Sequence, residues 1–218
     1  SVMGISPQKV KVVLDAKGLK DDWIEVFEQW LPKQVDPQTT AYVYVAGRAM
    51  VDHETGAVSL LPYDATLSGS SRAFSLARLQ RALTNAPVKQ AVVMLDLSLE
   101  PSSGSDPARV AQPRWISPEA NGEQERVMLM VGNAIVQEAQ AYQPGQHGLF
   151  TYFLLKGLRG AADLDKNGSV LTGELCAYVQ RQVTAVGRST SGDTQQPLCL
   201  PDANGASPLR QLRLSKLP

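Results

Sequence analysis

Short apolar runs and longer amphipathic stretches alternate along the chain. Runs rich in valine, leucine, methionine and tyrosine are typical of strands, and they occupy residues 9–14, 40–46, 90–95 and 126–131. Apolar residues at helical spacing predict helices over residues 23–31, where Pro32 should end the helix, and over 75–83 and 147–158. This order predicts an α/β fold with a mostly parallel sheet flanked by helices on both faces.

The length of 218 residues suits one domain with a sizeable core. Between residues 97 and 125 the chain loses any sustained period and is interrupted by Pro101, Pro107, Pro113 and Pro118. We therefore expect a long loop there. A mobile surface segment and a partner-binding loop both agree with its composition.

Charge and cysteine content narrow the classes of partner. Lys and Arg number 21, as do Asp and Glu, so the formal net charge is zero and no basic field favours nucleic acid. No apolar run approaches the roughly 20 residues that span a bilayer, and residues 1–5 lack the features of a signal peptide. Cys176 and Cys199 form neither a metal-ligand pattern nor a disulfide framework, so we expect them to be packing residues.

Two of the expected strands end in polar residues. Residues 40–49 lead to Arg48, and residues 91–98 lead through Asp96 to Ser98. In α/β sheets, ligands and reacting groups gather beyond the carboxyl ends of the strands. These two runs resemble bacterial caspase-like (C14, metacaspase-related) peptidases, whose runs are of the type Tyr-x-Ser-Gly-His-Gly and Leu-Asp-x-Cys-x-Ser-Gly. Residues 60–64 resemble the family's next hairpin, and residues 146–160 resemble its late helix.

The resemblance implies a caspase-like sheet with its N-terminal strand missing. The family's first strand lies inside the sheet, beside the strand that residues 9–14 resemble, and nothing here matches it. An empty interior position would leave backbone groups unpaired. We expect an upstream segment of a larger protein, a neighbouring chain or the alternating residues 209–214 to complete the sheet. Among these, we favour a fragment of a larger protein.

The resemblance also implies degenerate chemistry, because the His position holds Arg48 and the Cys position holds Ser98. A guanidinium stays protonated and cannot shuttle protons. Ser98 needs a base within hydrogen-bond reach, and His53 is the candidate. In metacaspase-like relatives an acid at the position of Asp96 helps receive a basic substrate side chain. Asp96 is therefore either a pocket remnant, a partner of Arg48 in an ion pair, or an ordinary strand-end acid.

Residues 163–174 fit the twelve-position EF-hand pattern. Side-chain oxygens, the carbonyl of residue 169 and a bidentate Glu would converge on Ca²⁺, while Gly168 permits the sharp turn. Leu171 offers no side-chain oxygen, which predicts modest affinity. An Asx-rich turn that only connects two helices is the alternative. The candidate ligands are Asp163, Asp165, Asn167, Ser169 and Glu174.

Three functional hypotheses follow from these residues. The leading one is a pseudo-peptidase domain that acts as a binding or scaffolding module, with a structural calcium ion. The second is an active caspase-like peptidase, or a hydrolase dependent on Ser98, that cleaves after basic residues. The third is a structural subunit of a larger assembly.

Overall fold

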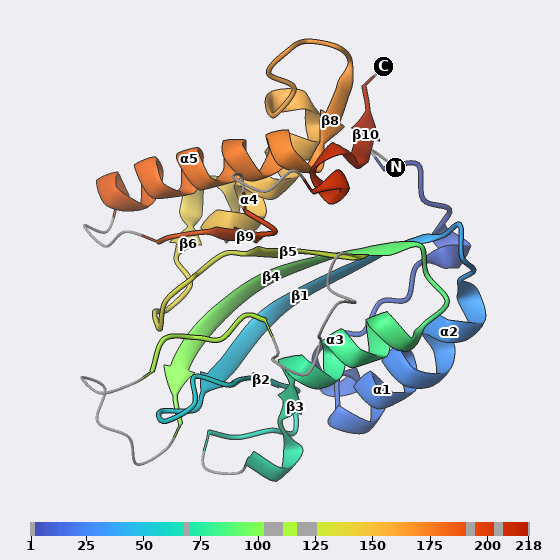
Figure 1. The fold of residues 1–218 in the computed structure, drawn as a ribbon. Helices are drawn as coiled ribbons and strands as arrows, with labels where there is room; N and C mark the ends of the chain where they lie inside the picture. The colour runs from blue at the N-terminus through green and yellow to red at the C-terminus, as the bar shows by residue number, and fades with distance from the viewer. Residues whose placement is uncertain are drawn as a thin grey trace.

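A six-stranded mixed sheet lies at the centre of the computed structural model. The structure describes residues 3–67, 70–102, 111–116, 126–190, 195–202 and 207–217. The strands of this sheet are β1 (Thr40–Val51), β2 (Val58–Leu61), β3 (Phe74–Ser75), β4 (Gln90–Pro101), β5 (Val127–Val131) and β9 (Leu198–Leu200). They lie in the order β3-β2-β1-β4-β5-β9 (Figure 1). The α/β prediction is confirmed. Parallel pairing joins β1 to β4 and β4 to β5, while the outer pairs are antiparallel, so the sheet is mixed and not mostly parallel as expected.

One core lies between the strands and the N-terminal helices. These helices are α1 (Lys20–Ile24), the π-helical η3 (Glu25–Trp30), α2 (Leu31–Gln34) and α3 (Leu76–Asn85). Pro32 does not end the first helical stretch: α2 follows the π-helical η3 directly, and Pro32 is its second residue. Phe27, Leu79 and Leu83 pack in this core with Val43, Leu95 and other strand residues.

A second core holds side chains from the alternate strand positions, which point to the opposite face. Met94 and Met130 pack there with residues of α4 (Leu149–Lys156) and α5 (Thr172–Thr190), such as Phe150 and Val179. Figure 1 shows α4 and α5 on the other side of the strands from α1 and α3. The central strands are therefore buried between two apolar clusters, which agrees with their nearly continuous apolar sequence.

Small elements complete the fold. The remaining strands are β6 (Ala141–Tyr142), β7 (His147–Gly148), β8 (Ser169–Leu171) and β10 (Arg213–Lys216); β6 pairs with β7, and β8 pairs with β10. The short helices are η1 (Pro7–Lys9), η2 (Asp15–Lys17), η4 (Ser70–Arg72), η7 (Gln143–Gly145), η8 (Gly157–Ala161) and η9 (Pro208–Gln211). Within the described ranges, no helix has both the length and the apolar character required to span a membrane.

One expectation about the chain's organisation is wrong, and one of the three candidates for completing the sheet is excluded. Residues 9–14 form no strand: η1 ends at Lys9, and residues 10–14 continue irregularly to η2. Residues 209–214 do not complete the central sheet, because residues 208–211 form η9 and β10 pairs with β8.

The predicted loop over residues 97–125 begins later than expected. β4 continues to Pro101, because Leu97 and Leu99 are buried and extend its pairing with β1. Residues 111–116 are anchored by Trp115, which is 4% exposed and donates its indole N–H to the Ala134 carbonyl at 3.0 Å. Residues 103–110 and 117–125 of the predicted loop lie outside the described residues.

Candidate functional site

Arg48 and Ser98 occupy neighbouring positions on parallel strands. They are register partners in the pairing of β1 with β4, and their side chains therefore emerge on the same face. The Arg48 Nε donates to Glu100 Oε1 at 2.7 Å, while 57% of the Arg48 side chain stays exposed. This hydrogen bond, together with the Glu100 charge, raises the pKa of Arg48. Arg48 is thus a permanent cation bound to a neighbouring carboxylate.

Ser98 makes a structural hydrogen bond, and its expected base, His53, is engaged elsewhere. Its Oγ accepts a hydrogen bond from the Ala139 backbone N–H at 3.0 Å. His53 instead places Nδ1 3.4 Å from Ser102 Oγ, with Nε2 3.7 Å from Glu54. Because four residues of strand span roughly 13 Å, Ser98 lies beyond hydrogen-bond reach of this imidazole. The arrangement gives Ser98 no base from His53.

Asp96 is a buried carboxyl group beneath the start of α4. Its side chain is held by Thr151, whose backbone N–H donates to Oδ2 at 3.3 Å and whose hydroxyl donates to the same oxygen. The Thr151 hydroxyl also lies 2.7 Å from the Tyr44 hydroxyl. Burial raises the pKa of Asp96, against the opposing effect of the two Thr151 hydrogen bonds. The expected ion pair with Arg48 does not form, since Arg48 binds Glu100 and Asp96 binds Thr151.

The Asp96 carboxyl sits close against the backbone. A Cβ atom at Gly148 would lie 2.5 Å from Asp96 Oδ2, and one at Gly132 would lie 3.3 Å from Oδ1. Asp96 Oδ1 has no hydrogen-bond partner within the described structure. Asp96 therefore stabilises the first turn of α4, where the N–H groups lack helical acceptors. Asp96 accepts a backbone hydrogen bond, as one interpretation expected, but it lies within β4 (Gln90–Pro101) and not at the end of the strand.

Buried amide side chains make hydrogen bonds to β4 and to the segment that follows β5. Asn133 and Gln195 are fully buried. Asn133 Nδ2 donates to the carbonyls of Leu97 and Gln137, at 3.4 and 3.3 Å, and Gln195 Nε2 donates to Gly132 at 3.0 Å. Sequence reasoning missed both residues, because they lie in irregular segments where no period marks burial. Glu100 could have been found from the sequence, because it lies two residues after Ser98 and therefore on the same strand face.

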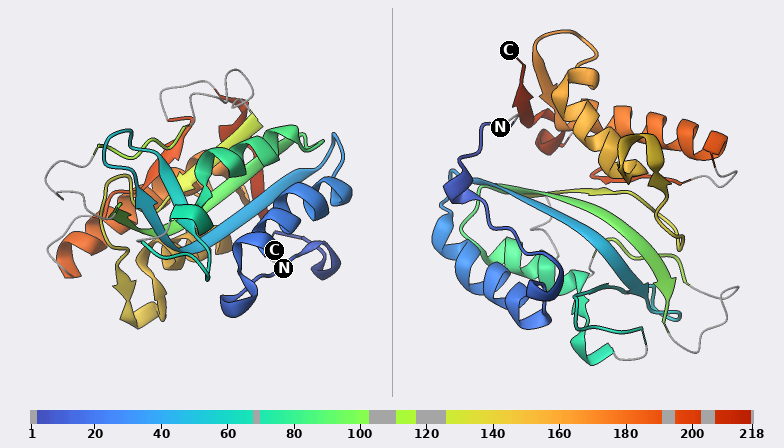
Figure 2. Two further views of the ribbon diagram at one scale, coloured as in Figure 1. Left: turned by 90° about the horizontal axis from the view of Figure 1, so that it is seen from below. Right: turned by 180° about the vertical axis from the view of Figure 1, so that it is seen from behind.

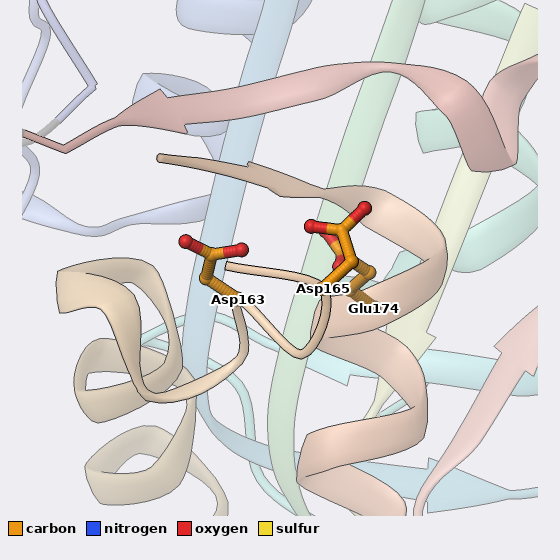
Figure 3. A group of neighbouring side chains, drawn as sticks. All are labelled: Asp163, Asp165 and Glu174. Atoms are coloured by element: carbon orange, nitrogen blue, oxygen red, sulfur yellow. The ribbon is translucent and has the colours of Figure 1, made fainter. Parts of the chain in front are cut away.

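The predicted calcium loop lies between η8 and α5, and it brings three acids together. Side-chain oxygens of Asp163, Asp165 and Glu174 all lie within 4.8 Å of one another. Figure 3 shows the three carboxylates around one turn of the loop, with Glu174 supplied by the first turn of α5. Carboxylate oxygens are ligands that hard divalent cations prefer. The acids form a cluster that could bind a metal ion.

Backbone hydrogen bonds hold the loop in this shape. Asp163 accepts from the N–H groups of Asn167 and Gly168 at 3.1 and 3.0 Å, and Glu174 Oε2 accepts from Leu171 at 2.9 Å. Gly168 has a φ of 79°, which an L side chain rarely adopts. The Asn167 amide oxygen accepts from the Ser169 N–H at 2.9 Å, so it is directed toward the backbone. The carboxylates converge, whereas the Asn167 oxygen would have to turn to reach a shared ion.

The loop is fastened to the rest of the protein by the C-terminal strand. β10 pairs antiparallel with β8, and the Leu217 N–H donates to the Gly168 carbonyl at 2.8 Å. Thr172, at the start of α5, donates its hydroxyl to the Leu209 carbonyl and is fully buried. The acidic loop therefore rests on a fixed frame, which lowers the conformational entropy that ion binding would cost.

Cys176 and Cys199 form a disulfide, which corrects the expectation that they only pack. The bond joins α5 to the edge strand β9 across a sequence separation of 23 residues. Both residues are buried in the second core. Two isolated cysteines in elements far apart in sequence gave no spacing signal, and only the docking of α5 against β9 brings them together.

Comparisons with family models and with curated proteins do not identify a family for this chain. No protein-family model matches the chain. No curated protein matches it at a significant level.

Proposed function

We propose that this chain is a catalytically degenerate caspase-like domain that acts as a binding or scaffolding module. The observation that best supports this proposal is that Arg48 and Ser98 are register partners on the neighbouring strands β1 and β4. These are the positions at which the resemblance expects the catalytic His and Cys. Their proximity supports the proposed layout, and their chemistry argues against turnover.

Neither Arg48 nor His53 can activate Ser98 in the way a cysteine peptidase activates its nucleophile. Such an enzyme needs a base that accepts the nucleophile's proton and returns it to the leaving amine. Arg48 stays protonated and is engaged by Glu100, while Ser98 is engaged by the Ala139 N–H. We therefore assign to this face a role in holding partners without cleaving them.

A peptidase assay separates this proposal from the hydrolase hypothesis. The purified chain is incubated with fluorogenic peptides that carry Arg or Lys before the scissile bond, with Ca²⁺ or with chelator. We expect background rates in every condition and no change on Ser98→Ala. Calcium-stimulated cleavage that Ser98→Ala abolishes would refute the proposal.

Thiol chemistry tests the layout itself. The double substitution Arg48→His with Ser98→Cys would place an imidazole beside a thiol on neighbouring strands, which lie about 4.8 Å apart. A neighbouring protonated imidazole lowers a thiol pKa. We expect this double variant to be alkylated faster at neutral pH than the control Arg48→Ala with Ser98→Cys, which has no cation beside the thiol, by about tenfold for a thiol pKa that is lower by one. Identical pH profiles for the two variants would contradict the layout.

We also propose that the loop over residues 163–174 binds a calcium ion with a structural role. Its support is the convergence of Asp163, Asp165 and Glu174 within 4.8 Å. Three carboxylates so close together repel one another, and a divalent cation would offset that repulsion. Because the loop joins η8 to α5, an ion there would stabilise the second core and the surface that it supports.

Calorimetric titration with Ca²⁺, after chelator treatment, tests this site. Glu174→Gln keeps an acceptor for the Leu171 N–H but removes a charge, so we expect binding to weaken by roughly tenfold or more. Glu54→Gln is the matched control, since Glu54 lies in the turn between β1 and β2, and it should leave binding unchanged. Absence of heat at millimolar Ca²⁺ would favour a purely connecting turn.

A further inference from the structure

β1 has one open edge. On one side β4 pairs with it from Thr40 to Val51, whereas on the other side β2 pairs only with residues 48–51. Among the described strands no other one pairs with β1, so residues 40–47 present unpaired backbone groups. This stretch contains neither a charged residue nor a proline. Natural sheets usually protect an edge with such residues, and an unprotected edge is a template for another strand.

A second strand-like feature lies near the N-terminus. Val10, Val12 and Leu14 are 50%, 65% and 66% exposed. The backbone is extended at both ends of this segment, with φ and ψ of −110° and 121° at Val10 and −130° and 141° at Leu14. Alternate residues of an extended chain point to the same side, so these apolar side chains form one exposed row. The segment has the pattern of a half-buried strand, but it belongs to no sheet.

Within one copy, this segment passes along the open edge without pairing to it. At its start, the Lys9 charge adds a small contribution to the lowered pKa of Asp36, whose main cause is the Thr39 hydroxyl hydrogen bond. Just beyond its end, the Gly18 carbonyl accepts from the Tyr63 N–H at 2.9 Å. Asp36 precedes β1 and Tyr63 follows β2, so the segment spans the open stretch. The right-hand view of Figure 2 shows the dark blue chain descending beside β1 toward α1.

We infer that two copies of this chain exchange these segments, so that residues 10–14 of one copy pair as an added strand with residues 40–47 of the other. The exchange is reciprocal and closes on itself with two-fold symmetry, so that each open edge receives a strand from the other copy. It covers the exposed row of valine and leucine side chains in both copies. Asp15, with a φ of 47°, lies directly after the segment and marks the position of the hinge. Moving the segment also clears the edge beside which it lies in a single copy.

Sedimentation equilibrium from low micromolar to near-millimolar protein tests the exchange. We expect the wild-type mass to rise with concentration to twice the 23.5 kDa of one chain. Val12→Pro removes a backbone donor and should keep the protein monomeric across this range. Its fold should survive, because Val12 is exposed and lies outside every helix and strand.

Val12→Thr is the matched control, since threonine keeps both the N–H group and a high strand propensity. It should dimerise like the wild type. A wild-type mass of one chain at every concentration would overturn the inference, as would a dimer that Val12→Pro leaves intact. Mass spectrometry of the purified protein adds another check. A foreign peptide bound in stoichiometric amount would show that the open edge of β1 takes up a different strand and not a second copy of this chain, and it would overturn the inference.

Discussion

The disulfide between Cys176 and Cys199 should contribute a large part of the stability of the fold. Replacing both residues by alanine removes a covalent link between α5 and β9 that closes a loop with a sequence separation of 23 residues. In the chain-entropy model, a loop of this length gives about 3 kcal/mol through restriction of the unfolded chain. For a chain of this size, that corresponds to a loss of roughly 6 to 12 °C in melting temperature. Lost packing of the two sulfur atoms adds to the effect.

Urea denaturation followed by circular dichroism measures this contribution. The wild type should lose stability in reductant, because its unfolded chain is then no longer restricted. The double variant Cys176→Ala with Cys199→Ala should start near that lower value and be insensitive to reductant. The reasoning fails if titration of the unreduced, unfolded wild type finds two free thiols, or if reductant leaves its midpoint unchanged. Formation of the bond in cells would also indicate an oxidising compartment.

Two further predictions concern single positions. Because burial raises the pKa of Asp96 above its ordinary 3.8, the folded state binds this proton more tightly than the unfolded state. The stability that this proton contributes to the folded state is complete below pH 3.8 and is lost as pH rises through the folded pKa. Each tenfold difference in proton affinity between the folded and unfolded states corresponds to about 1.4 kcal/mol. Asp96→Asn should remove this pH dependence in thermal unfolding, and an unchanged slope would contradict it. Gly56→Ala should cost about 2 kcal/mol or more in urea denaturation, because Gly56 has a φ of 70° and its Cβ would meet the Gln112 carbonyl oxygen at 2.2 Å. A variant as stable as the wild type would show that residues 111–116 do not dock there.

Local patterns predicted the central elements well. The apolar runs at residues 40–46, 90–95 and 126–131 became β1, β4 and β5, and the helical period over residues 75–83 became α3. β2 (Val58–Leu61) forms an antiparallel pair with β1, where the resemblance had implied a hairpin over residues 60–64. The central strands are apolar runs because both of their faces are buried, whereas α3 has the helical period that one buried face imposes. The same rule failed for residues 9–14, where an alternating pattern exists but no neighbouring strand pairs with it.

The candidate site was predicted in part. The spacing of acids and glycine along residues 163–174 was sufficient to locate the acidic cluster, because all its members lie within one short loop. The partners of Arg48 and Asp96 were not predicted. Glu100 and Thr151 reach them through strand register and through the docking of α4, and both are relations between distant parts of the chain.

By itself, the sequence determined where the central strands and α3 lie along the chain, the absence of a net charge, and the composition of the acidic loop. These properties depend on local period and residue type. Only the tertiary structure decided the mixed strand order, the disulfide, the hydrogen bonds of Ser98 and Asp96, and the open edge of β1. Each of those depends on which segments meet in space, and long-range pairing leaves little trace in the local pattern of a single chain.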